Sequence, residues 1–345
     1  MININLLIKT IKMSKTIKGR LSHLDKYIQK KWEEYFMDFV IRNEDKFDWK
    51  FISCNPNITM GMIEQYLDKE WDWDRVSENP NLTIEFVDKY PDKEWDWYNI
   101  SQNQNITWDI IENNPDKDWN WYAISRNPNI TMEIIENNPN KDWNYMSITS
   151  NPNITMDFIE RHPNKRWSWE WLSQNPYITM EMIEEYPNKP WNWKWISRNP
   201  NITMEFIEQR PDKSWLWNYI SGNPNITIEI IENNPDKSWD WGWCGLSDNP
   251  NITMEFIEKY PNKDWDWRDI SQNQNITISD IEQYPDKPWE RKYFSRNHFT
   301  KEKELFYQKY YRKYLATFRL QQYFNRMYDN PNYLFCRKRL EKLFS

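Results

Sequence analysis

A pattern of apolar and polar residues about 24 residues long occurs ten times between residues 47 and 300. The copies share the approximate consensus N-P-N-I-T-M-E-F-I-E-x-Y-P-D-K-x-W-D-W-x-x-I-S-x. Eight threonines from Thr59 to Thr227 recur every 24 residues, and Thr253 and Thr277 continue the series after one interval of 26. This fixed period is typical of a solenoid, because so small a unit can bury its apolar face only against its neighbours.

The copy at Thr203 predicts two short helices. Asn-Pro-Asn is typical of a turn. Thr203 is a suitable N-cap, and the isoleucine before it can pack against the one four residues after it as a hydrophobic staple. Pro211 ends the first helix. Trp217 and Ile220 lie three residues apart, which favours a second short α- or 3₁₀-helix. No stretch alternates long enough to predict a strand.

The residues that recur in every copy predict how the copies stack. A tryptophan stands at the same point in all ten copies, from Trp71 to Trp289, and each can bury roughly 150–250 Å². The lysine two residues before it is also constant, and we expect its stem to lie over a tryptophan face. The asparagine that precedes each Pro or Gln is constant too, and we expect it to cap backbone groups between copies as a buried ladder.

These features predict an all-α solenoid of about ten repeats that is roughly 90–100 Å long at 8–10 Å per packed layer. We divide the chain into residues 1–46 (an N-terminal segment and capping helix), 47–300 (the repeats) and 301–345 (a basic, aromatic helical cap or tail). Residues 21–43 predict an amphipathic helix that covers the open end of the stack. Phe306, Tyr310, Tyr314 and Phe318 form one apolar stripe of a second helix.

The repeats resemble the leucine-rich variant repeat, whose 24-residue unit carries an N-P-x-T-P-x-x-L-L core. Asn-Pro-Asn-Ile-Thr followed by Glu-Phe-Ile or Glu-Ile-Ile matches that core, whereas the W-x-W half departs from it. The resemblance implies alternating α- and 3₁₀-helices in a right-handed superhelix. The N-P-N-I-T and P-D-K-x-W-D-W strings are similar to Asn-rich, Trp-rich tandem-repeat proteins of giant amoebal viruses, over about residues 47–297. That similarity implies a viral origin and the fold rather than an activity.

Composition and charge limit the cellular compartment and the classes of partner that we expect. Mean hydropathy is −1.02, yet 24 tryptophans argue against disorder. Three scattered cysteines and three scattered histidines predict reduced thiols, no metal site and a cytoplasmic location, in the host cytoplasm or the virion if the protein is viral. No apolar run is long enough for a membrane span. Residues 49–289 carry 21 basic and 40 acidic side chains, a net −19, whereas residues 290–345 carry 14 and 5, a net +9.

Two local features have competing interpretations. Residues 242–245 lie in the one copy that is two residues longer and holds two of the five glycines. This insertion either bulges from the stack at a binding face or is a tolerated replication error. Nine copies contain Asn-x-Thr, a glycosylation motif, but the threonine is better explained as a helix cap.

The positions that vary between copies supply the candidate binding residues. Aromatic side chains recur just after the second tryptophan without being constant, as expected of an interface, although plain packing is the alternative. The candidates for partner binding are Tyr98, Tyr122, Trp171, Trp195, Tyr219 and Trp243. The candidates for nucleic-acid contact in the basic tail are Lys309, Arg312, Lys313, Arg319 and Arg326.

The expected function is a non-catalytic protein–protein interaction scaffold of viral origin, with no cofactor. The carboxylates recur with the repeat, whereas an active site would break the symmetry. Two alternatives remain: nucleic-acid association through the tail alone, since the acidic repeats repel phosphate, and a structural component of the virion.

Overall fold

The computed structural model describes residues 15–329, and all regular elements within that range are helices. Two compact units are present. One contains α23 (Thr300–Asp329) and the part of α2 (Lys15–Arg42) up to Tyr35, and the other is residues 36–299. The boundary between the units falls inside α2. The predicted all-α repeat architecture is confirmed.

Ten copies in residues 36–299 begin with an outer helix that starts at a threonine cap. The Thr155 hydroxyl, for example, accepts a hydrogen bond from the Phe158 amide at 3.1 Å, which satisfies one of the free donors at the start of the helix. Every threonine of the series caps its helix in this way, so the capping interpretation of Asn-x-Thr is confirmed. The outer helices are α4 (Met60–Gln65), α6 (Ile84–Lys89), α8 (Trp108–Asn113), α10 (Met132–Asn137), α12 (Met156–Arg161), α14 (Met180–Glu185), α16 (Met204–Glu208), α18 (Ile228–Asn233), α19 (Met254–Lys259) and α21 (Ile278–Gln283).

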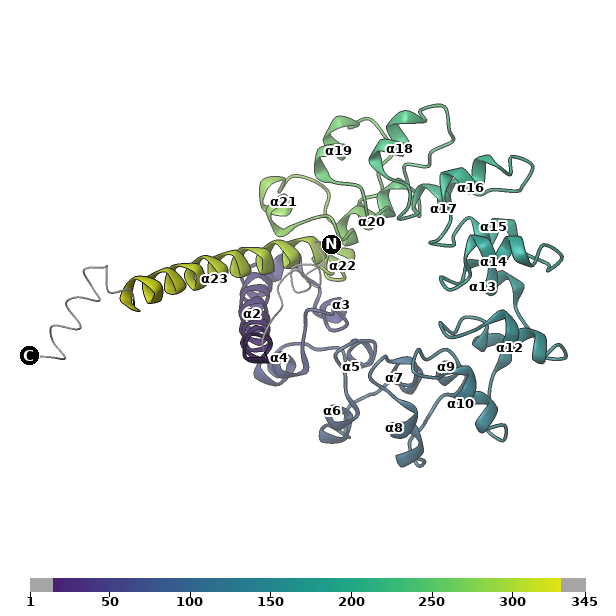
Figure 1. The fold of residues 1–345 in the computed structure, drawn as a ribbon, viewed down its shortest axis with the longest axis horizontal. Coiled ribbons are helices and arrows are strands. Elements are labelled where there is room, and N and C mark those ends of the chain that lie inside the picture. Colours follow the sequence, from purple (N-terminus) through teal and green to yellow (C-terminus); the bar gives the residue numbers. More distant parts are fainter. Residues whose placement is uncertain (1–14, 330–345) are drawn as a thin grey trace, which may run out of the picture. The chain divides into compact units, whose positions relative to one another are not determined.

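The second half of each copy forms an inner helix, on the inner side of the array in Figure 1. Its isoleucine or equivalent apolar residue and the serine or threonine after it are buried in every copy. The inner helices are α3 (Trp49–Ile52), α5 (Trp73–Val76), α7 (Trp97–Gln102), α9 (Trp121–Ile124), α11 (Tyr145–Ile148), α13 (Trp169–Gln174), α15 (Trp193–Ile196), α17 (Trp217–Ser221), the 3₁₀-helix η2 (Leu246–Asp248), α20 (Trp267–Gln272) and α22 (Arg291–Phe294).

The predicted asparagine ladder is confirmed. The Asn151 side-chain amide donates to the carbonyl oxygens of Ser125 (3.0 Å) and Asn127 (3.1 Å) in the preceding copy. Equivalent bonds join each asparagine to the one before it, so buried backbone carbonyls find donors. The ladder has eleven members: Asn55, Asn79, Asn103, Asn127, Asn151, Asn175, Asn199, Asn223, Asn249, Asn273 and Asn297.

The ladder has no end, because its first member bonds to its last. The Asn55 amide donates to the carbonyl oxygens of Ser295 and Asn297, both at 2.8 Å. A second closed series of hydrogen bonds lies beside the ladder. Each buried serine or threonine hydroxyl accepts a hydrogen bond from the backbone amide of the residue before the next inner helix. Between the last and the first copy, the Asp48 amide donates to the Ser295 hydroxyl at 2.7 Å. Residues 36–299 therefore form a closed ring of eleven copies.

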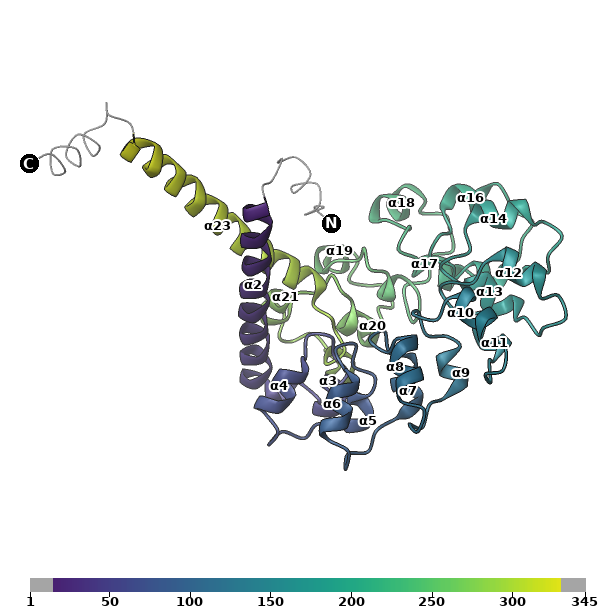
Figure 2. The ribbon, with the colours of Figure 1, turned by 60° about the horizontal axis from the view of Figure 1, so that its bottom comes forward.

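This closure corrects the expectation of an open rod. We call the junction between the last and first copies the seam. There Phe47 packs on Phe294 with ring centroids 4.8 Å apart, and Phe39 of α2 packs on Phe299 at 6.3 Å. The last turns of α2, from Phe36 onward, take the place of an outer helix, followed by the 3₁₀-helix η1 (Glu44–Lys46). The eleventh copy thus carries only the second half of the repeat signature, from Trp49 to Ser53, with the end of α2 in place of the first half. Figures 1 and 2 show its position between α21 and α4.

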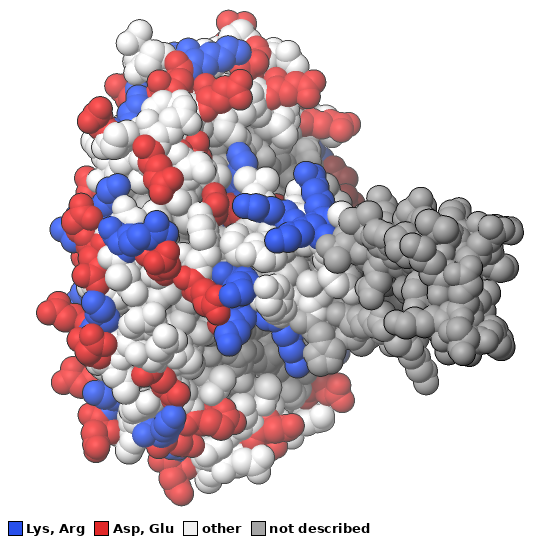
Figure 3. Space-filling view, turned by 90° about the vertical axis from the view of Figure 1, so that its left-hand side faces the viewer, with Lys and Arg blue, Asp and Glu red and all other residues white. Residues whose placement is uncertain are grey.

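Tryptophans and lysines join neighbouring copies as predicted. Trp121 and Trp143 meet edge to face with centroids 5.2 Å apart, and the same pairing recurs around most of the ring. The constant lysine lies over the second aromatic residue of the preceding copy, as with Lys93 at 4.7 Å from Trp73. Ion pairs such as Lys89–Glu64 (2.6 Å) link the outer helices, but exposed pairs like this stabilise weakly. Figure 3 shows acidic side chains scattered over the face that it draws, with basic side chains between them.

The unit formed by α23 and the first part of α2 is held by aromatic packing. Phe306 lies against Trp32 (5.4 Å between centroids) and Tyr35 (5.2 Å), and Tyr310 lies against Tyr27 (6.4 Å). Two members of the predicted stripe therefore face α2. Phe318 is in the helix, in a part where side chains are not described.

Candidate functional site

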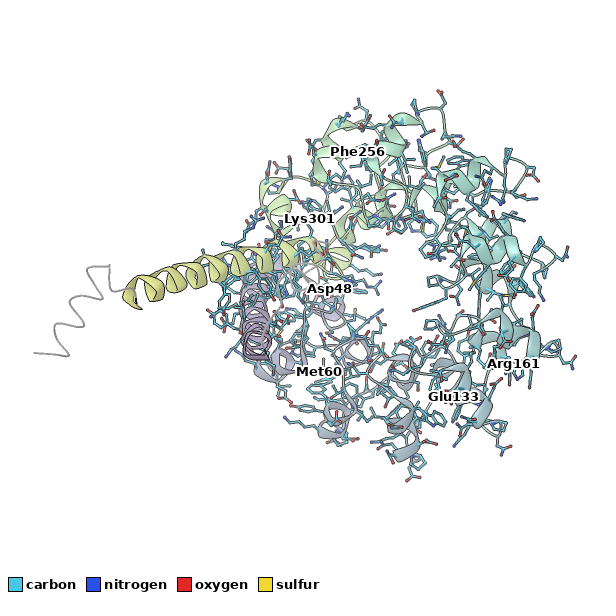
Figure 4. All side chains as sticks on the ribbon, in the orientation of Figure 1. Asp48, Met60, Glu133, Arg161, Phe256 and Lys301 are labelled. Carbon is cyan, nitrogen blue, oxygen red and sulfur yellow. The ribbon has the colours of Figure 1, made fainter. Side chains whose placement is uncertain are left out.

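The residues of each inner helix divide into a constant buried set and a variable set. The tryptophan that begins the helix, the apolar residue three positions later and the serine after it lie on one side, because these spacings fall on one face of a helix. That side faces the outer helices and the core. Positions one, two and five after the tryptophan lie on the opposite side and vary between copies. We call this variable surface the inner wall, and Figure 4 shows the side chains around the open centre of the ring, with Asp48 labelled near it.

Two predicted partner-binding residues stack on each other on the inner wall. Tyr98 of α7 and Tyr122 of α9 have ring centroids 6.2 Å apart and planes inclined by 25°. Both rings are half-buried, and Arg126 donates to the Tyr98 hydroxyl at 3.4 Å. The pair is therefore an ordered aromatic surface with a cation at its edge.

A second aromatic pair stands on α15 and α17. Trp195 and Tyr219 stack with centroids 6.3 Å apart and planes inclined by 20°, and the Arg198 guanidinium lies 5.4 Å from the Tyr219 ring. Trp171, on α13, is half-buried at the equivalent position of the preceding copy. The structure thus places five of the six candidates on the inner wall, in two groups on different parts of the ring.

The sixth candidate, Trp243, lies in the insertion and is 63% exposed. In this copy a loop replaces the regular inner helix, and Cys244 adopts a positive φ of 55°. The Cys244 amide donates to the buried Asp269 carboxylate at 2.9 Å. Burial raises the pKa of Asp269 to about 6, because a charged carboxylate is costly to desolvate. The insertion therefore exposes an aromatic side chain and buries a carboxyl group, while the asparagine ladder continues through Asn249.

The sequence analysis missed a basic group at the seam. Phe51 of α3 is buried, and three cations from neighbouring copies surround its ring: Arg75, Lys292 and Arg296. We call these four residues the seam cluster. The charges at inner-wall positions could have indicated it, but only once the first and last copies were known to be neighbours.

The tail candidates lie on α23. Lys309, Arg312 and Lys313 are exposed, away from the aromatic face that packs on α2. Arg319 and Arg326 are within the helix, but their side chains lie outside the described residues. The exposed three recur at spacings that keep them on neighbouring parts of one helical surface.

Within residues 15–329 no group of three or more His, Cys, Asp or Glu side chains is arranged to hold a metal ion. None of the helices in that range combines the length and the apolar character that crossing a bilayer requires. Cys54 and Cys244 are free thiols, and Cys336 lies outside the described residues.

Comparisons with known proteins do not narrow the site further. No protein-family model, no curated protein and no solved structure matches this chain.

Proposed function

We propose that this protein is a non-catalytic interaction scaffold that binds a protein segment along the inner wall of its ring. One observation carries the proposal: the constant residues are buried in stacking, whereas the variable inner-wall positions hold half-buried aromatic pairs beside cations. Aromatic residues and arginine are the side chains most enriched at protein interfaces.

The exposed insertion supports the same proposal. Trp243 is the most exposed large apolar side chain found among the described residues. An exposed tryptophan on a loop that departs from the repeat is suited to anchor a partner, because large aromatic side chains bury much area at low entropic cost. The insertion would then add specificity to a surface whose frame is otherwise uniform.

A pull-down that compares matched variants tests the proposal. The full chain, a Tyr98→Ala/Tyr122→Ala variant and a Tyr177→Ala control are used as baits in one lysate. Tyr177 is 52% exposed but lies in the turn before an outer helix, outside the inner wall. A partner retained by the wild type and the control and lost by the double variant supports the proposal. Equal retention by all three baits contradicts it.

Nucleic-acid association through α23 is the second candidate function. Its support is the exposed group Lys309, Arg312 and Lys313, in a region whose sequence carries a net +9. Charge reversal of these three residues should abolish binding of a nucleic acid and leave an inner-wall partner bound. Binding that survives the reversal excludes this function.

A viral origin, a cytoplasmic location in the host and a structural role in the virion rest on the sequence resemblance alone. Mass spectrometry of purified particles tests the last of these. A structural component should be abundant in particles, whereas a scaffold that acts on host proteins should be found chiefly in infected-cell lysate.

A further inference from the structure

We propose that the seam cluster is an oxyanion-binding site that takes an acidic, Asp/Glu-rich peptide segment. This inference rests on the proposed function and names the chemistry of the partner at one place on the inner wall. The cluster consists of Phe51, Arg75, Lys292 and Arg296, contributed by α3, α5, α22 and the residue that follows α22 by two positions.

Three cations converge on one aromatic ring. The Lys292 ammonium lies 4.8 Å, the Arg296 guanidinium 4.9 Å and the Arg75 guanidinium 5.0 Å from the centroid of Phe51. Like charges brought this close repel one another. The ring face compensates part of this repulsion through cation–π attraction, and an anion bound among the cations would compensate more.

The carboxylates of the chain neutralise the group only in part. Arg75 is paired with Glu78 at 2.8 Å. Among the described residues no carboxylate lies within 4.0 Å of the Lys292 or Arg296 cationic nitrogens. The buried Nε of Arg75 also finds no hydrogen-bond acceptor in the described part of the chain. The Arg75 side chain is half-buried, and a planar guanidinium with an unused donor is suited to a carboxylate, which accepts in the same plane.

The seam is the basic part of the inner wall. From α22 through α3, α5 and α7 to α9, the variable positions carry five cations and two carboxylates. From α11 to α20 they carry three of each. The residues of the first arc are Lys50, Asp74, Arg75, Glu78, Arg126, Lys292 and Arg296. The whole excess of positive charge on the inner wall therefore lies on the arc from α22 to α9, which contains the seam cluster and the Tyr98–Tyr122 pair.

A hollow beside the cluster gives a peptide room to enter. It has a volume of about 950 Å³ and is lined by Lys50 and Lys292 together with the segments that precede α3, α5 and α22. Four carboxylates also line it. Asp48 caps α3, and Asp72 caps α5 and pairs with Lys50 at 3.4 Å, so two of the four are engaged. Glu70 and Glu290 also line it, and both are exposed.

A short acidic peptide fits this setting better than a nucleic acid. The inner-wall aromatics already stack on each other in pairs, so a nucleobase would have to separate them to find a ring face. The repeat region carries a net −19, which repels a long polyanion along its length. A short segment avoids most of that repulsion, since charges beyond about 8 Å are screened at physiological salt.

Fluorescence anisotropy with a labelled octaglutamate peptide tests the inference on the full chain. The test variant is Lys292→Glu/Arg296→Glu, and the control is Lys89→Glu/Lys259→Glu, which reverses two exposed lysines on the outer helices α6 and α19, outside the inner wall. A Lys292→Gln/Arg296→Gln variant is measured as well, and circular dichroism melting checks that each protein is folded. A labelled oligothymidylate serves as the second probe.

We expect the seam reversal to weaken octaglutamate binding at least tenfold and the control reversal to change it less than twofold. No binding by the wild type, or equal loss in both reversals, would overturn the inference. Tighter binding of oligothymidylate that is lost in the seam variant would overturn it in favour of a nucleic acid. If octaglutamate fails while a partner is still lost in Tyr98→Ala/Tyr122→Ala, the proposed function stands and only this inference is wrong.

Discussion

The seam and a regular interface of the ring use the same polar bonds but different apolar packing. Asn151 reaches the carbonyls of the copy before it, and Asn55 does the same across the seam. A regular interface is filled by an edge-to-face tryptophan pair, whereas the seam is filled by phenylalanines. The asparagine ladder is therefore the same at every interface of the ring, whereas the apolar side chains that pack beside it differ.

Chain connectivity makes the second difference. A regular interface is held by a covalent link as well as by its contacts, while only side chains and their bonds close the seam. Arg291 adds a bond that regular copies lack, from its guanidinium to the Phe47 carbonyl at 2.8 Å. We therefore expect the seam to open before any other interface does, since it can separate without unstacking a neighbouring copy.

The largest effect should come from the ladder. Asn151→Ala removes three donated bonds and leaves buried carbonyls without partners, which should cost about 3–5 kcal/mol of unfolding free energy. Asn55→Ala removes two bonds at the seam and should cost less, because the ring can open there. Urea unfolding measures both variants. Equal losses would mean that the seam behaves as a regular interface.

Phe47→Ala should break the seam alone. The side chain is 1% exposed and packs on Phe39 and Phe294, so its loss should cost about 3 kcal/mol. Hydrogen exchange should speed up first at the Asp48 and Asn57 amides, which lie at the seam. X-ray scattering should show a larger radius of gyration if the ring opens. Exchange that rises evenly in all copies would contradict a weak seam.

The contrast between seam and regular interface also explains what could be predicted from the sequence. Each regular copy carries its own caps and ladder, so Thr203 and Asn199 could be assigned from one 24-residue unit. Closure could not, because the eleventh copy takes its outer helix from the end of α2 and has Phe47 in place of the first tryptophan, so that only Trp49 to Ser53 match the repeat. Ring closure depends on a small rotation per copy, and no single residue encodes it.

The site shows the same limit. Stacked aromatic residues such as Tyr98 were found because they vary on a constant frame. The seam cluster was missed because Lys292 and Arg296 lie about 220 to 245 positions after Phe51 and Arg75 in the sequence. In addition, the net charge of −19 of the repeats conceals the positive charge of one part of the inner wall. Charge counted by position within the copy would have revealed the basic positions, but not that they meet.

Asp269 should make the insertion copy sensitive to pH. Its pKa is about 6 in the folded protein and about 3.8 when exposed. Below the lower value the carboxyl group is protonated in both states. Above pH 6 it is ionised in both states, and burial then penalises the folded one. Stability should therefore fall as pH rises from about 4 to about 7, by roughly 1–3 kcal/mol at 1.36 kcal/mol per pKa unit.

Two substitutions check the sign of this effect. Asp269→Asn should stabilise the protein at neutral pH and change little near pH 4, as read from urea unfolding at both pH values. Asp266→Asn is the control of opposite sign, because the Arg268 guanidinium lowers the pKa of Asp266. It should destabilise at neutral pH and lose its effect as the pH falls through the range where Asp266 is protonated. The same sign in both variants would contradict the assignment.

The smallest expected change in stability comes from two glycine substitutions, one beside the insertion loop and one in a regular copy. A β-carbon at Gly222 would lie 2.8 Å from the Cys244 carbonyl oxygen, which belongs to the backbone of the insertion loop. At Gly61, in α4, the nearest atom would be the Thr59 hydroxyl at 3.9 Å. Gly222→Ala should therefore cost about 1–2 kcal/mol by forcing the loop away, whereas Gly61→Ala should stabilise its helix by about 0.5–1 kcal/mol.

Thermal unfolding measures both glycine variants, and the direction of each change is the informative result. If Gly222→Ala is destabilising, the insertion loop is held against the copy before it and Trp243 is presented from a fixed position. If Gly222→Ala is neutral or stabilising, the loop yields without cost, and the argument that Trp243 is an ordered anchor fails. The Gly61→Ala control excludes a general response of glycine positions in this ring, since both glycines belong to copies with an intact asparagine ladder.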